Sequence, residues 1–205
     1  MKNSSVVERP HSALVVTAAL VVALVAALAS GCGLETDKAN QYMSRAAAHQ
    51  DAAEAILARL KSFPAEWEAL FNVPSVGPAQ VTAGRQLTVD READVDAFKA
   101  ELVQWEKDLD PILELNVDAK VKEYIRLKIA AIDAWKSYAE DYLIPLIKSC
   151  QGMVEIIAYG RPAAEQAAKA EEIAGEVAEA SAKLQECLTA EQRADDYFGD
   201  NKLGK

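Results

Sequence analysis

The sequence predicts an all-α fold: an elongated antiparallel four-helix bundle with a short extra helix and a long loop between the first two helices. Three observations support this. Ala, Glu, Lys and Leu are abundant and only 9 of the 205 residues are glycine, a composition that favours helix. Apolar residues recur at alternating spacings of three and four, which places them on one helix face. No run of alternating β-branched residues is long enough for a sheet.

The first long helix is predicted to begin at Lys38 and to end near Ser62. Thr36 or Asp37 can cap its N-terminus, and Pro64 is expected to stop it because proline lacks a backbone N–H. The residues predicted to face the core are Tyr42, Ala46, His49, Ala53, Ile56, Leu60 and Phe63.

A short amphipathic helix is predicted over residues 63–73, followed by a long loop over residues 74–89. The loop prediction follows from two prolines and two glycines within 16 residues. Four apolar side chains share one side of the short helix: Phe63, Trp67, Leu70 and Phe71. They are either a cap on the end of the core, which is the usual role of such clusters, or a binding surface.

The second long helix is predicted to begin at Asp90, because acidic residues in a first turn suit the helix dipole, and to be interrupted at Pro111. Its core residues have the most regular spacing in the chain: Val95, Phe98, Leu102, Trp105, Leu109 and Ile112. If the chain then reverses near Glu114, Asp108 faces Lys120 and Glu106 faces Lys122, pairs of opposite charge.

The third helix is predicted over residues 117–158 with a bend at Pro145, and the fourth over residues 163–189 after a break at Gly160. The fourth helix is expected to bury Ala170, Ile173, Val177, Ala180, Leu184 and Cys187. The helical domain therefore extends over residues 38–190. Residues 191–205 are polar and are predicted to form a disordered tail.

The first 32 residues have the features of an export signal. Lys2 and Arg9 precede residues 13–29, an apolar run without charge, and residues 28–32 then read Leu-Ala-Ser-Gly-Cys. This pattern resembles the signal peptide of bacterial lipoproteins. The resemblance implies that residues 1–31 are removed after Gly31, that the sulfur of Cys32 carries a diacylglycerol, and that residues 32–37 form a short tether.

The alternative for the same residues is an uncleaved transmembrane anchor. The apolar run has 17 residues, near the lower limit for crossing a bilayer, and an ordinary anchor has no use for a cysteine after small residues. The lipoprotein interpretation is therefore preferred. Because Gly33 rather than aspartate follows Cys32, the resemblance implies an outer-membrane protein facing the periplasm in a host with two membranes. In a host with one membrane, it implies the outer face of the plasma membrane.

Few residues suggest chemistry. His49 is the single histidine after residue 31, and no second ligand stands at metal-binding spacing, so no metal or other cofactor is predicted. Cys150 and Cys187 form a candidate disulfide, which an exported protein favours. Helix geometry opposes the bond: in a hairpin turning at Gly160, Cys187 lies roughly 22 Å beyond the level of Cys150. The bond and two buried thiols both remain open.

These observations predict a non-enzymatic protein. The preferred interpretation is a membrane-tethered envelope lipoprotein whose helical bundle binds or scaffolds another envelope protein. A net charge of −10 argues against a nucleic-acid partner. The alternative is an envelope carrier or sensor that holds a small apolar ligand between helices, which would require a cavity of about 300 Å³ or more.

Overall fold

The computed structural model describes residues 35–73 and 75–203, and this part of the chain is all α-helical, as predicted. The long helices are α2 (Thr36–Phe71), α3 (Pro78–Leu109), α4 (Ala119–Tyr138), α5 (Ile144–Ala158) and α6 (Ala163–Asp200). Two short segments join them: the 3-10 helix η2 (Asp110–Glu114) and the π-helix η3 (Ala139–Leu143). The predicted signal peptide, its cleavage site at Gly31 and Cys32 lie outside the described residues.

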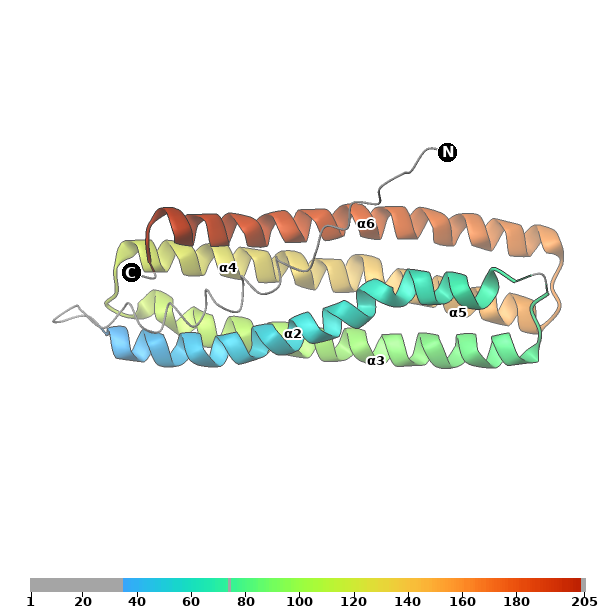
Figure 1. Ribbon diagram of the computed structural model, residues 1–205, viewed down its shortest axis with the longest axis horizontal. Coiled ribbons are helices and arrows are strands. Elements are labelled where there is room, and N and C mark those ends of the chain that lie inside the picture. The colour runs from blue at the N-terminus through green and yellow to red at the C-terminus, as the bar shows by residue number, and fades with distance from the viewer. Residues whose placement is uncertain (1–34, 74, 204–205) are drawn as a thin grey trace, which may run out of the picture.

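The helices form a bundle along one common direction, with α4, η3 and α5 as one continuous rod (Figure 1). Helix α3 packs against α2, α4 and α5, while α6 packs against α4 and α5. Arg45 pairs with Asp108 and Arg59 with Asp94, so residue numbers rise along α2 as they fall along α3. Within the described residues, no helix is long and apolar enough to cross a membrane.

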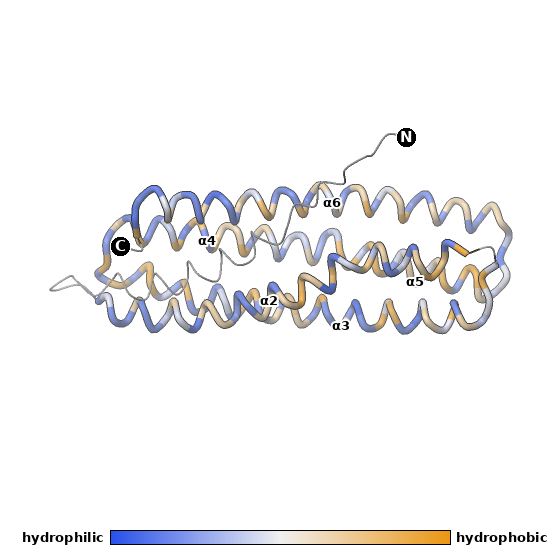
Figure 2. The backbone as a smooth tube through the Cα atoms, viewed as in Figure 1, coloured by the Kyte–Doolittle hydropathy of each residue, from blue (hydrophilic) through white to orange (hydrophobic). Residues whose placement is uncertain are grey.

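The core follows the predicted helix faces most closely in α3. All six residues predicted to face inward from this helix and η2 are buried, from Val95 to Ile112. Phe98 meets Trp135 of α4 edge-on, with ring centroids 6.1 Å apart. Figure 2 shows hydrophobic and hydrophilic residues alternating along each helix, as expected where one face is buried.

Pro64 does not end the first helix, and the separate short helix predicted over residues 63–73 is instead the last part of α2. Interrupting a helix with proline costs about 3 kcal/mol. Aromatic packing offsets that cost: Phe63 is buried in the core, and Trp67 stacks on Phe71 with ring centroids 4.4 Å apart.

The long loop predicted over residues 74–89 is also wrong, because α3 begins at Pro78 rather than at Asp90. Proline suits the first position of a helix, where its missing N–H is not needed. The side chain of Gln80 accepts a hydrogen bond of 3.0 Å from the backbone N–H of Gly77, which caps this end. Gly77 and Pro78 thus mark a helix start, and Gly84 a close contact, where an extended loop was predicted.

That close contact is at Gly84, where α3 meets the end of α2. A Cβ atom at Gly84 would lie 2.6 Å from Cζ of Phe71 and 3.0 Å from a methyl group of Val154. Such distances are far below van der Waals contact. Gly84 therefore allows the Phe71 ring to fill the space between α3 and α5.

Pro145 follows the π-helical turn of η3, which accommodates it. The backbone N–H of Ile144 bonds to the carbonyl of Ala139, five residues earlier, so the turn widens directly before the proline. The helix thereby continues through the predicted bend.

The chain reverses between η2 and α4, but later than the predicted turn at Glu114, so the charge pairs predicted across the α3–α4 hairpin are wrong. Lys136, not Lys122, pairs with Glu106, and Arg45 of α2 pairs with Asp108. Segment η2 and residues 115–118 form the turn, in which Ile112 is buried. Helix α4 then starts at Ala119, later than expected.

The tail predicted to be disordered from residue 191 is helical to Asp200, so the domain extends beyond residue 190. Ala194 and Phe198 are buried, and the Phe198 ring lies 5.2 Å from that of Tyr124. The polar composition of residues 191–205 did not indicate this buried face of α6, because its buried residues are few and widely spaced.

Glycine substitutions provide a matched test of the packing. We expect Gly84→Ala to lower the free energy of unfolding by about 1–3 kcal/mol, because Phe71 must move. Gly175→Ala, on α6 with no atom within 4 Å of the added carbon, should raise it by roughly 0.5–1 kcal/mol through helix propensity. Urea unfolding followed by circular dichroism measures both; an unchanged midpoint for Gly84→Ala would contradict the close packing.

Candidate functional site

The candidate site is an open groove between the last part of α2 and the first part of α6, the α2/α6 groove. It comprises two adjacent hollows, of about 70 and 560 Å³, which both border Pro64 and Val177. Its α2 wall consists of Leu60, Lys61, Pro64, Ala65, Trp67 and Glu68. Its α6 wall consists of Ala170, Ile173, Ala174, Val177, Ala180, Ser181 and Leu184.

Small side chains on α6 keep this groove open. Ala170 and Ala174 are exposed, and they are too short to reach the α2 wall. Beneath the walls lie Tyr138, Leu143 and Leu146, all of them buried. The groove therefore has an apolar floor and a surface that water reaches.

The other half of the seam between α2 and α6 contains a buried polar group, the Lys128 cluster. The ammonium group of Lys128 in α4 lies 2.8 Å from a carboxylate oxygen of Asp195 in α6, and only 3 % of Lys128 is exposed. The same group lies about 6 Å above the rings of Trp105 and Tyr124, within cation–π range. Glu191 of α6 completes the cluster.

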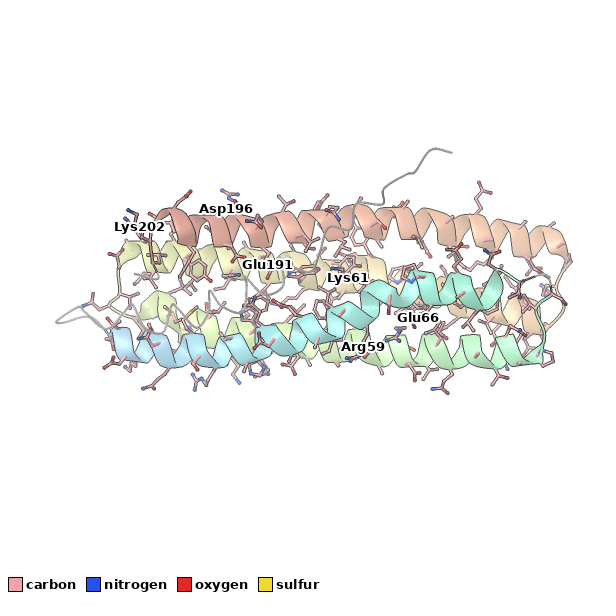
Figure 3. The ribbon with its side chains drawn as sticks, in the orientation of Figure 1. Arg59, Lys61, Glu66, Glu191, Asp196 and Lys202 are labelled. Carbon is pink, nitrogen blue, oxygen red and sulfur yellow. The ribbon has the colours of Figure 1, made fainter. Side chains whose placement is uncertain are left out.

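The charges in this cluster depend on one another. Burial works against the charge of Lys128, but Tyr124, Asp195 and Glu191 outweigh it and raise the pKa of its ammonium group. Burial raises the pKa of the Glu191 carboxyl; Lys128 opposes this shift, and the nearby carboxylate of Glu54 adds to it. Figure 3 shows Glu191 and Lys61 between the α2 and α6 ribbons, whereas Arg59 and Glu66 lie on the side of α2 next to α3.

His49 belongs to a different network, which ties α2 to α3. Its Nδ1 lies 2.6 Å from Glu101 and its Nε2 lies 3.7 Å from Asp108, which also pairs with Arg45 at 3.2 Å. Two carboxylates of α3 thus lie close to the histidine, which is turned toward α3 and not toward the groove. Among the residues described, no three His, Cys, Asp or Glu side chains are arranged to hold a metal ion.

The candidate disulfide is absent: Cys150 and Cys187 are buried free thiols. Ser149 bonds to Glu172 and Glu176, so Cys150 lies level with that part of α6, far from Cys187 along the helix. Burial raises the pKa of Cys150 to about 12 and that of Cys187 to about 11, so neither thiol is reactive near neutral pH.

The four residues proposed as a binding surface are divided by the structure. Phe63 is 1 % exposed and belongs to the core, and Phe71 packs on Gly84. Leu70 is partly buried. Trp67 alone among them lines the α2/α6 groove. The α6 wall was not recognised as a binding surface, because Ala170, Val177 and Leu184 were predicted to face the core; Ala170 is exposed, and the other two are only partly buried.

The alternative function, a carrier of a small apolar ligand, needs an enclosed cavity, and the enclosed hollows among the described residues are small. The hollow beside Lys128 and Trp105 holds about 10 Å³, and the one above Tyr138 about 70 Å³. Ligand pockets usually hold 300–1,000 Å³. The larger hollow of the α2/α6 groove is open to the surface, which suits a macromolecule better than an enclosed ligand.

Comparisons with known protein families, with curated proteins and with solved structures found no match to this chain.

The Lys128 cluster predicts a specific pH dependence. The folded-state pKa of Glu191 is raised above its unfolded value, so its contribution to stability is present below the unfolded pKa and is lost as pH rises through the folded pKa. We therefore expect Glu191→Gln to become more stable relative to wild type as the pH rises above about 4.5, the ordinary pKa of glutamate. Urea unfolding across this range measures the difference. Parallel curves for the two proteins would contradict the prediction; Glu179→Gln, an exposed position, is the control.

Proposed function

We propose that the mature chain is a membrane-tethered envelope lipoprotein, and that its helical domain, an elongated antiparallel four-helix bundle, binds or scaffolds another envelope protein without catalysing a reaction. The observation that carries the proposal is the open apolar α2/α6 groove. Apolar surface of this kind, bordered by polar residues, is typical of protein interaction sites. The groove walls belong to α2 and α6. Away from the groove, α2 packs against α3, and α6 packs against α4 and α5.

The proposed tether orients the bundle. The backbone N–H of Glu35 donates to the carbonyl of Asn116, and the N–H of Asn116 donates to the Glu35 carboxylate, at 2.9 and 3.0 Å. These bonds hold the start of the helical domain against the α3–α4 connection. Glu35 is three positions after Cys32, a reach of at most about 10 Å, so a lipid on Cys32 would keep this end near the bilayer.

The groove lies toward the opposite end. Pro64 is 28 residues beyond Thr36, about 42 Å along a helix axis. In an upright bundle, the groove would face partners in the envelope space and not the lipid. Removing residues 1–31 takes away Lys2, Arg9 and Glu8, so the mature net charge is −11, which disfavours anionic membrane surfaces and nucleic acids as partners.

Membrane attachment is tested at Cys32. We expect the wild-type protein to fractionate with membranes, to begin at Cys32 and to carry acyl mass, because the sulfur is lipidated; Cys32→Ala should lack that mass. Intact mass spectrometry of each fraction measures both properties. If residues 1–31 stay attached and both proteins partition alike, the anchor is a transmembrane segment instead.

Protein binding is tested by photo-crosslinking from the groove. A benzoylphenylalanine in place of Ala174, on the groove wall, should crosslink to another envelope protein in cells of the native host. The same residue in place of Ala182, an exposed alanine on the outer side of α6, is the matched control. Equal yields from the two positions, or no crosslinked protein at Ala174, would contradict the proposal.

A further inference from the structure

The groove has features that specify the kind of segment it accepts. We propose that the α2/α6 groove receives a basic amphipathic helix of another envelope protein, which docks between α2 and α6 as an additional helix of the bundle. This inference rests on the proposed function and adds the chemistry of the partner.

Helix α6 carries two heptad-spaced faces. One is buried against α4 and α5 and consists of Ile173, Ala180, Cys187 and Ala194. The second has spacings of 3-4-3-4-3 and consists of Ala167, Ala170, Ala174, Val177, Ser181 and Leu184, all of which except Ala167 line the groove toward α2. Such a series is the pattern by which one helix receives the side chains of another. This second face has no helix seated on it over its first half.

The dimensions of the groove suit a helix. From Ala170 to Leu184 there are 14 residues, about 21 Å or four helical turns. The exposed alanines at 170 and 174 allow a close approach of a neighbouring helix. Trp67 and Val177 on the two walls offer larger apolar contacts at one level of the groove.

The surrounding charge selects a basic partner. Residues 163–182 contain five glutamates and one lysine, a net charge of −4. The single lysine, Lys169, is already paired with Glu172 at 2.6 Å. Lys61 and Glu68 both line the α2 wall and offset each other, so the negative charge comes from α6, where Glu171 is exposed, and from the acidic chain as a whole. A second copy of this chain would bring the same negative charge to the contact, whereas lysine or arginine beside an apolar face would complement it.

Pro64 adds a polar feature to the α2 wall. Because proline has no N–H, the carbonyl of Leu60, one turn earlier, lacks its usual helical donor. Both residues line the groove. A lysine or arginine side chain of a docked helix can donate to this oxygen.

The test identifies the segment captured from Ala174 and measures its dependence on charge. Mass spectrometry of the crosslinked peptide should find a segment with helical apolar periodicity and a net positive charge. Glu68→Lys with Glu171→Lys should lower the crosslinking yield about tenfold by repelling that segment. Asp96→Lys with Glu114→Lys changes the net charge equally at exposed positions on α3 and η2, outside the groove walls and outside residues 163–182, and should leave the yield unchanged. Thermal unfolding followed by circular dichroism confirms that both double variants fold.

The outcomes separate this inference from the proposed function. A partner captured through an acidic or non-helical segment, or a yield that both double variants leave unchanged, would overturn the basic-helix inference while protein binding stands. A crosslink to a second copy of this chain would also overturn it. If Ala174 captures nothing that Ala182 does not, both proposals fail.

Discussion

The buried ion pair between Lys128 and Asp195 is the interaction on which the arrangement of α6 depends. An ammonium group with 3 % exposure is stable only if a carboxylate neutralises it, and Asp195 lies 2.8 Å away on α6. Replacing either partner alone would leave a charge buried without compensation, whereas sliding α6 by one turn would separate them by about 5 Å. The pair thus favours one register of α6 on α4.

That register determines which residues line the groove. With Asp195 held at Lys128, Ser149 of α5 meets Glu172 and Glu176, and the alanine-rich start of α6 lies beside Trp67 of α2. The seam between α2 and α6 therefore has two halves of different character. Charged and aromatic groups fill the half near Lys128, while small residues leave the other half open. The ion pair between Lys128 and Asp195 sets the register of α6 and therefore the position of both halves of the seam.

Sequence periodicity predicted the faces of the helices far better than their ends. The face of α3 from Val95 to Ile112 is buried as expected, because a strict alternation of spacings leaves one choice of orientation. Pro64 and the residues after 190 were misjudged, since local signals there favour a break or disorder. Tertiary contacts override them: Phe71 packs on Gly84, and Phe198 packs on Tyr124. Such contacts join residues far apart in sequence and cannot be read from local composition.

The groove illustrates the same limit in the site itself. Trp67 was among the predicted binding residues, but half of the site comes from α6, more than 100 residues away along the chain. Its signal was present as a second series of spacings that begins at Ala167, yet alanine is equally common in buried and exposed helix faces. What distinguishes this series is that α2 does not cover it, a fact of register and not of composition. Helix faces that remain uncovered once the registers are set are therefore where binding should be sought in a helical bundle.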